Sequence, residues 1–186
     1  MSLLEESIMK APIVKKGDYN YIVHPLTDGI PEIDPKLLEE VIEKMLQFLP
    51  RDAEKIVTIE AMGIPLATAI SLKIGKPFTI IRKRQYGLPG EVSVEQVTGY
   101  SKSKLFINGI KKGERVVIVD DVLSTGGTLK AVLEALKEMG VKVEKVLIAI
   151  DKGKVAQEIE KEFGVPVISM ANIEVKEDKV IINSIR

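Results

Sequence analysis

The chain has no cysteine and a single histidine, His24. Without cysteine it can form no disulfide bond, offer no thiolate nucleophile and build no zinc site on thiolates. One histidine also argues against a histidine-rich metal centre and against a serine–histidine–aspartate triad. These classes of metal and hydrolytic site are therefore not expected.

An excess of charge of one sign and long apolar runs are missing as well. The 27 Lys and Arg residues balance the 27 Asp and Glu residues, so no overall basic field favours nucleic acid. No apolar run approaches the roughly 20 residues that a membrane span needs, and residues 1–7 lack the basic start of a signal peptide. We expect a cytoplasmic protein that binds neither nucleic acid nor a membrane.

The 186 residues, 45% of them hydrophobic, are enough for one domain with a sizeable core. Short β-branched runs alternate with helical patterns, which predicts an α/β fold with a single doubly wound parallel sheet. No repeat or linker is present, so we expect one domain, 1–186. The expected strands are 56–59, 78–81, 116–119, 146–150 and 167–168, the expected helices are 35–49, 64–72, 129–139 and one ending at 163, and a hairpin is expected at 173–182.

Residues 116–128 carry the most informative pattern. An apolar strand runs into Asp120 and Asp121, and a turn of small residues then opens a helix. The turn's backbone N–H groups, its hydroxyls and the helix N-terminus suit a phosphate dianion, and the two carboxylates can accept hydrogen bonds from sugar hydroxyls. The stretch therefore predicts a ribose 5-phosphate site. The turn residues are Ser124, Thr125, Gly126, Gly127 and Thr128.

Two shorter motifs suggest further contacts with anions. The first follows the expected strand 56–59 and begins a helix, so its backbone can bind a phosphate group, although an ordinary strand-to-helix turn has the same pattern. The second is a basic triplet that ends strand 78–81, and it is either a solvated turn or a set of cations that binds pyrophosphate. The residues are Ala61, Met62 and Gly63 in the first motif and Arg82, Lys83 and Arg84 in the second.

Two segments interrupt the alternation. Residues 84–108 are rich in glycine at their start and then alternate between polar and apolar residues, which predicts a flexible arm of two antiparallel strands over the site. Residues 1–33 are expected to form an irregular hood. Its aromatic residues either stack on a ligand or pack over the edge of the sheet; they are Tyr19, Tyr21 and His24.

The strand, the acidic pair and the Thr-Gly-Gly-Thr turn resemble the phosphoribosyl-diphosphate (PRPP) signature of the type I phosphoribosyltransferases, and the resemblance covers nearly the whole chain. It implies that residues 124–128 bind the 5-phosphate of PRPP and that residues 61–63 and 82–84 bind pyrophosphate. It further implies catalytic roles for Asp120, Asp121 and Lys83, with Mg²⁺ as cofactor held by the two aspartates. A homodimer is implied too, in which basic residues of this region reach PRPP across the subunit interface. Among the three cations of the triplet, Lys83 is the foremost candidate for this contact.

The motifs point to a particular branch of this family. Gly-Leu-Pro-Gly-Glu at 87–91 resembles the adenine-specific branch, but Thr98-Gly99-Tyr100-Ser101-Lys102 lacks that branch's catalytic glutamate. Ser124 stands where the classical hypoxanthine-guanine branch has an aspartate. With His24-Pro25 near the N-terminus, the chain is most similar to the archaeal-type hypoxanthine/guanine phosphoribosyltransferases. No residue is identified that removes the purine proton.

This resemblance implies purine salvage, in which hypoxanthine or guanine receives the phosphoribosyl group of PRPP to give IMP or GMP. Lys152 can donate to the purine's 6-oxo group, although a surface lysine at a strand end is the simpler interpretation. The alternatives are an adenine phosphoribosyltransferase and a PRPP-sensing regulator of the same fold. A kinase-like phosphate binder has no support, since no Walker-type turn is present.

Overall fold

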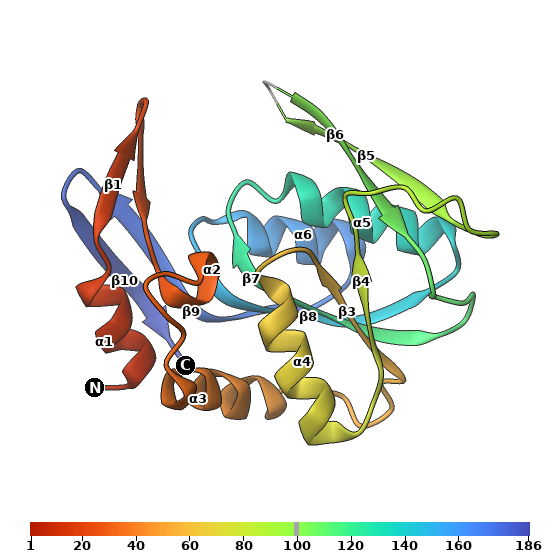
Figure 1. Cartoon of the computed structure of the whole chain (residues 1–186), viewed down its shortest axis with the longest axis horizontal. Helices are drawn as coiled ribbons and strands as arrows, with labels where there is room; N and C mark the ends of the chain where they lie inside the picture. The colour runs from red at the N-terminus through yellow and green to blue at the C-terminus, as the bar shows by residue number, and fades with distance from the viewer. Residues whose placement is uncertain (99–100) are drawn as a thin grey trace.

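The structure is a computed structural model that describes residues 1–98 and 101–186. Its centre is a six-stranded sheet with strand order β10-β9-β8-β7-β3-β4 (Figure 1). Neighbouring strands from β4 to β9 are parallel, and only β10 is antiparallel. The strands are β3 Lys55–Ile59, β4 Phe78–Ile81, β7 Arg115–Leu123, β8 Lys142–Asp151, β9 Val167–Lys176 and β10 Lys179–Ile185. The expected α/β fold with a doubly wound, mainly parallel sheet is confirmed.

Helices cover both faces of this sheet. α3 Pro35–Leu46 and α4 Gly63–Ile74 pack on one face, and α5 Gly127–Glu138 and α6 Val155–Phe163 on the other (Figure 1). The central strands therefore bury side chains in both directions, as the continuous apolar runs predicted. In β7, Val117 and Val119 face α3 and α4, whereas Val116 and Ile118 face α5 and α6.

The direction in which successive strands are added to the sheet reverses between β3 and β7. Counted along the chain, the five parallel strands are arranged second, first, third, fourth, fifth. After β3 the chain moves outward to β4, and then returns to β7 on the other side of β3. In such sheets ligands bind beyond the carboxyl ends of the strands at this switch point. The carboxyl ends of β3 and β7 carry the loop at 60–63 and the acidic pair.

Three strands are longer than the sequence predicted. β7 was expected over 116–119, but it continues to Leu123, because Asp120, Val122 and Leu123 still pair with β8. β8 and β9 likewise extend beyond 146–150 and 167–168. The polar residues at these strand ends hid the continuation, since backbone pairing does not require apolar side chains. Asp120 and Asp121 are consequently strand residues and not loop residues.

The hood is more regular than expected. It contains α1 Leu3–Lys10, a hairpin of β1 Ile13–Lys16 and β2 Tyr19–Ile22, and the short helix α2 Pro25–Asp28. Ser2 caps α1 by accepting from the Glu5 N–H, and Leu4 and Ile8 are buried beneath it. The hood thus contributes to the core on the face that also carries α3.

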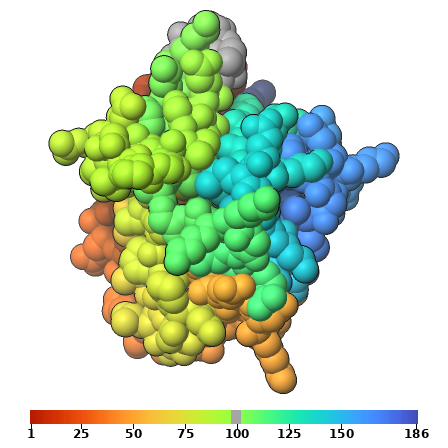
Figure 2. All heavy atoms as spheres, turned by 90° about the vertical axis from the view of Figure 1, so that its right-hand side faces the viewer, coloured from red at the N-terminus to blue at the C-terminus, as the bar shows by residue number. Residues whose placement is uncertain are grey.

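The arm consists of β5 Val92–Thr98 and β6 Ser101–Ile107, which pair in antiparallel fashion as expected. Its base is anchored, since Val94, Leu105 and Ile107 are buried in the core with α5 residues. Figure 2 shows the yellow-green arm lying against the cyan α5. Gly99 and Tyr100, part of the arm motif named above, lie outside the described residues.

No helix within residues 1–98 and 101–186 combines the length and the apolar character needed to cross a bilayer.

Candidate active site

The acidic pair lies at the carboxyl end of β7, next to the switch point. Asp121 is 8% exposed, and its N–H donates to Asp120 Oδ1 at 2.9 Å. Burial raises the pKa of Asp120 well above its usual range, and the neighbouring Asp121 raises it further. Burial also raises the pKa of Asp121, although the Lys152 ammonium opposes this. Two adjacent carboxyl groups, Asp121 buried and Asp120 half-buried, therefore favour a ligand that brings positive charge or hydrogen-bond donors.

The turn after β7 leads into α5, whose N-terminus has no side-chain cap. Gly126 has a φ of +82°, and a Cβ there would lie 3.0 Å from the methyl groups of Val155 in α6. Only glycine therefore allows the turn to pack this closely against α6. Ser124, Thr125 and Gly127 are exposed. The hydroxyls of Ser124 and Thr125 and the free N–H groups at the start of α5 remain available to an anion.

The loop between β3 and α4 forms a second uncapped helix start. Met62 precedes α4 and provides no side-chain cap. Gly63 is buried, and a Cβ at this position would collide with Thr58 Oγ1 and lie 2.8 Å from Asp120 Oδ1. The peptide between Glu60 and Ala61 is cis. In contrast, α1 and α3, which lie away from the strand ends, are capped by Ser2 and Asp34.

The basic triplet after β4 is organised by Glu60. Its Oε1 accepts from Arg82 Nε at 3.0 Å and from the Lys83 N–H at 2.6 Å, and these bonds lower the pKa of Glu60. The guanidinium groups of Arg82 and Arg84 both lie over the ring of Tyr86. Lys83 is exposed, and its ammonium contacts no acid among the described residues. Of the three cations it is therefore the freest to bind an anion.

Lys152 follows β8 and lies beside the end of β7. Its N–H donates to the carbonyl of Leu123 at 2.8 Å. Burial lowers the pKa of Lys152, while the carboxylates of Asp28 and Asp121 raise it. The next residue, Gly153, packs so tightly that a Cβ would lie 2.9 Å from the carbonyl oxygen of Ser124. The loop with Lys152 is therefore in contact with the turn at 124–128.

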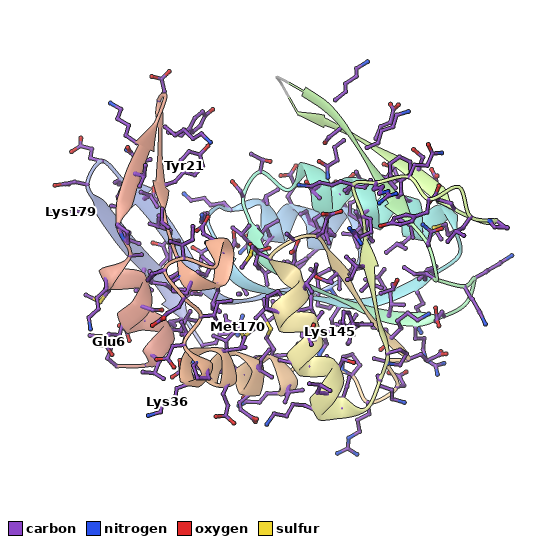
Figure 3. The ribbon with its side chains drawn as sticks, in the orientation of Figure 1. Glu6, Tyr21, Lys36, Lys145, Met170 and Lys179 are labelled. Carbon is purple, nitrogen blue, oxygen red and sulfur yellow. The ribbon has the colours of Figure 1, made fainter. Side chains whose placement is uncertain are left out.

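The hood closes the same end of the sheet. A Cβ at Gly29, directly after α2, would lie 3.5 Å from the terminal methyl of Met62, so the hood contacts the loop at 61–63. His24, offered above as a stacking residue, is fully buried: it accepts from the Leu26 N–H and its Nε2 lies 2.8 Å from Ser7 Oγ. Tyr21 is exposed on the side of the hairpin that faces the arm (Figure 3). Only the tyrosines remain available for stacking.

The chain is similar to known proteins over nearly its whole length. A family model described as phosphoribosyl transferase domain matches residues 32–179. The chain belongs to this family. It is 52% identical over 182 residues to a hypoxanthine/guanine phosphoribosyltransferase of Methanohalophilus mahii, with 98% of this chain and 95% of the relative covered. The protein of the same name from Methanothermobacter thermautotrophicus is also 52% identical over 182 residues, with 98% and 94% covered.

Solved structures of the family share the fold. The adenine phosphoribosyltransferase of Thermoanaerobacter pseudethanolicus has a TM-score of 0.72 at 25% identity, with 91% of this chain and 99% of that chain covered. The Trypanosoma brucei enzyme, solved with AMP, pyrophosphate and ribose-5-phosphate, has a TM-score of 0.74 at 20% identity, with 92% and 80% covered. The half-identical relatives and the structural neighbours thus belong to different purine branches of one phosphoribosyltransferase fold.

The motif that suggested the adenine branch has a structural explanation in this phosphoribosyltransferase. Glu91, the last residue of Gly-Leu-Pro-Gly-Glu, accepts hydrogen bonds from the N–H groups of Tyr86 and Gly87 and from Asn108 Nδ2. These bonds hold the base of the arm together and lower the pKa of Glu91. The motif therefore builds the start of the arm, a task that does not depend on which purine reacts.

Sequence reasoning missed two acidic residues of the site. Glu60 joins the loop at 61–63 to the basic triplet, and Asp28 approaches Lys152 from the hood. Glu60 stands between a strand and a glycine turn, which is a weak signal for this role. Asp28 carries no motif, and only the folding of the hood onto the strand ends reveals it.

The residues present are compatible with Mg²⁺ but do not form a complete protein cage. No group of three or more acidic or histidine residues suited to a metal occurs in the described part of the chain. Mg²⁺ commonly uses one or two carboxylates and completes its shell with water and substrate phosphates. Asp120 and Asp121 fit that donor set.

Proposed function

We propose that this phosphoribosyltransferase transfers the 5-phosphoribosyl group of PRPP to N9 of hypoxanthine or guanine, giving IMP or GMP and pyrophosphate. The observation that carries the proposal is the pairing of an uncapped helix start at Gly127 with the adjacent carboxyl groups of half-buried Asp120 and buried Asp121 on the strand before it. The purine class rests on relatives that are about half identical and are named hypoxanthine/guanine phosphoribosyltransferases.

The turn at 124–128 binds the 5-phosphate in this proposal. The phosphate dianion accepts hydrogen bonds from the first N–H groups of α5 and from the hydroxyls of Ser124, Thr125 and Thr128. Gly126 and Gly127 allow the backbone to approach the phosphate closely. Asp120 and Asp121 then accept hydrogen bonds from the ribose hydroxyls and lie near C1′, where positive charge develops as the bond to pyrophosphate breaks.

Pyrophosphate is the leaving group and gains negative charge in the same step. We assign its binding to the backbone of Ala61, Met62 and Gly63, at the uncapped start of α4, and to the cations of the triplet. Arg82 is neutralised by Glu60, so Lys83 is the main candidate for direct contact, and Arg84 supports it. When bound, Mg²⁺ would neutralise part of the pyrophosphate charge, with Asp120 and Asp121 as its protein ligands.

On the opposite side of the ribose, Lys152 is assigned to the purine. Its backbone is held beside the end of β7 by the hydrogen bond to Leu123, and its ammonium can donate a hydrogen bond to the 6-oxo group. The arm covers this centre and excludes water, which would otherwise attack C1′. We also propose a homodimer and a cytoplasmic location, the first from the family resemblance and the second from the sequence.

The deciding experiment measures PRPP-dependent pyrophosphate release with adenine, hypoxanthine and guanine in parallel, with and without Mg²⁺. We expect turnover with hypoxanthine or guanine that depends on Mg²⁺. Turnover with adenine alone would show that the purine assignment is wrong. Tight PRPP binding without turnover of any base would favour a PRPP-sensing regulator instead.

A further inference from the structure

Lys152 occupies an unusual place for a lysine. It is only partly exposed, and its ammonium forms no ion pair within 4 Å with any residue of the described ranges. Two carboxylates, those of Asp28 and Asp121, nevertheless lie near enough to favour its charged form. A partly buried ammonium without a direct partner is costly. Such a group is suited to donate a hydrogen bond to a ligand oxygen.

Asp28 is the second half of this arrangement. It is exposed at the end of α2, and its Oδ2 accepts from the His24 N–H at 2.9 Å and from Thr27 Oγ1 at 2.7 Å. Its other oxygen, Oδ1, accepts no hydrogen bond from a residue that the structure describes. One oxygen therefore fixes the orientation of the carboxylate, and the other remains free to accept from a ligand.

The position of Asp28 is held from three sides. Gly29, the next residue, packs against Met62 of the loop at 61–63. The buried His24 ties α2 to α1 through Ser7. α2 also lies beside the end of β7, where Asp121 and the contact to Lys152 are found (Figure 1). Asp28 is thus a fixed group at the mouth of the site and not a freely moving surface acid.

We propose that Asp28 Oδ1 and Lys152 Nζ form a matched acceptor and donor that recognises one edge of the purine, with Asp28 as the residue that sets specificity. Lys152 donates to the 6-oxo group, and Asp28 accepts from N1–H and, in guanine, from the 2-amino group. This inference rests on the proposed function, because it specifies the purine chosen by the same site.

The hydrogen-bonding pattern of each base then decides which base reacts. Hypoxanthine and guanine present an acceptor at position 6 and a donor at position 1, which complements the lysine and the carboxylate. Adenine presents the reverse pattern, a donor at position 6 and an acceptor at position 1. Xanthine places an oxo group at position 2, where it faces the carboxylate and is repelled. Once a bound base covers these two groups, a polar group left without its partner makes such discrimination strong.

The test is Asp28→Asn, assayed as kcat/KM for guanine, hypoxanthine, xanthine and adenine. Asparagine keeps a side-chain oxygen for the His24 N–H and Thr27, so the turn of α2 is preserved, but an NH₂ donor replaces the free acceptor. We expect kcat/KM for guanine to fall by about 10- to 100-fold, while xanthine gains relative to guanine. The ratio of guanine to xanthine should therefore fall by at least about tenfold.

Asp178→Asn, in the exposed turn between β9 and β10, is the matched control and should leave every ratio unchanged. Asp28→Ser, which removes the charge with a smaller side chain, serves if Asp28→Asn folds poorly; it should lose preference for guanine over hypoxanthine.

An equal fall for all bases, with ratios kept within about twofold, would overturn the role of Asp28 while the proposed reaction stands. Inactivity of the unmodified protein with every base would overturn the proposed function itself.

Discussion

Gly63 and Gly126 lie where a side chain would collide with a neighbouring element. At Gly63 the obstacles are the Thr58 hydroxyl and the Asp120 carboxylate, and at Gly126 they are Val155 and Ile159 of α6. The Thr58 hydroxyl is itself buried without a hydrogen-bond partner in the described part of the chain. At the residue scale, side chains of neighbouring elements that pack directly against the backbone thus determine which positions of the site must be glycine.

Gly63→Ala should destabilise the protein and disturb the loop that we assign to pyrophosphate. The added methyl forces Thr58 and Asp120 aside, and overpacking of this kind costs about 1–3 kcal/mol. Thermal unfolding and kcat/KM measure the two effects. The double variant Gly63→Ala, Thr58→Ala removes the main obstacle, so it should recover part of the stability. No recovery would mean that the collision with Thr58 is not the cause.

Thr125→Val keeps the size of the side chain and removes one hydroxyl from the turn at 124–128. Because Thr125 is exposed and makes no packing contact in the core, folding should be unchanged. A hydrogen bond to a charged phosphate contributes about 1.5–3 kcal/mol, so kcat/KM for PRPP should fall by about 10- to 100-fold. Steady-state kinetics at varied PRPP give the value, and circular dichroism checks the fold. Normal kinetics would argue against this assignment of the 5-phosphate.

At the scale of elements, the arm and the loop at 61–63 are mechanically connected. Arg82 forms an ion pair with Glu60 through its side chain, and its backbone pairs with Phe106 in β6 through two hydrogen bonds. Movement of the arm would therefore act on the residue that neighbours Lys83. The buried base of the arm confines such movement to the part beyond Val94 and Leu105.

Glu91→Ala should loosen the base of the arm without unfolding the sheet. The substitution leaves the N–H groups of Tyr86 and Gly87 and the Asn108 amide without their shared acceptor. Amide hydrogen exchange at residues 86 and 87 should accelerate, whereas amides in α5 should keep their protection. Glu95→Ala, at an exposed position of the same arm, is the control. Unchanged exchange at residues 86 and 87 would show that Glu91 does not hold this turn.

For the whole molecule, the hood is attached through a buried neutral histidine. His24 Nδ1 accepts from the Leu26 N–H, so the proton lies on Nε2 and donates to Ser7 Oγ. Burial lowers the pKa of His24 to about 4. Protonation would place a charge in a buried site, and the Asp28 carboxylate offsets only part of the cost.

Stability should therefore fall as the pH drops from about 6.5 toward 4. In this window the unfolded chain binds a proton at His24 and the folded chain does not, which lowers the free energy of unfolding by about 1.4 kcal/mol per pH unit. Urea unfolding at pH 7 and pH 5 measures the change, and His24→Gln should reduce the dependence. Because the chain has one histidine, the difference between the two proteins isolates this group. Equal pH dependence would contradict the buried neutral state.

The contiguous parts of the site could be predicted from the sequence. Asp120, Asp121 and the turn at 124–128 follow one another along a strand, a turn and a helix start, so short-range patterns were sufficient to place them. The limits of β7 could not be predicted, because pairing with β8 continues past the apolar residues. The regular secondary structure of the hood could not be predicted either, since α2 depends on the contact between His24 and Ser7, which are 17 residues apart.

The sequence by itself determined the alternating α/β fold, the phosphate-binding turn and the acidic pair, because each depends on residues close together in the chain. Only the tertiary structure decided which distant groups meet at the strand ends: Glu60 with Arg82, Gly29 with Met62, and Asp28 near Lys152. The physical reason is the parallel sheet. It gathers the carboxyl ends of strands that are far apart in the sequence, and no local pattern specifies which side chains will then be neighbours.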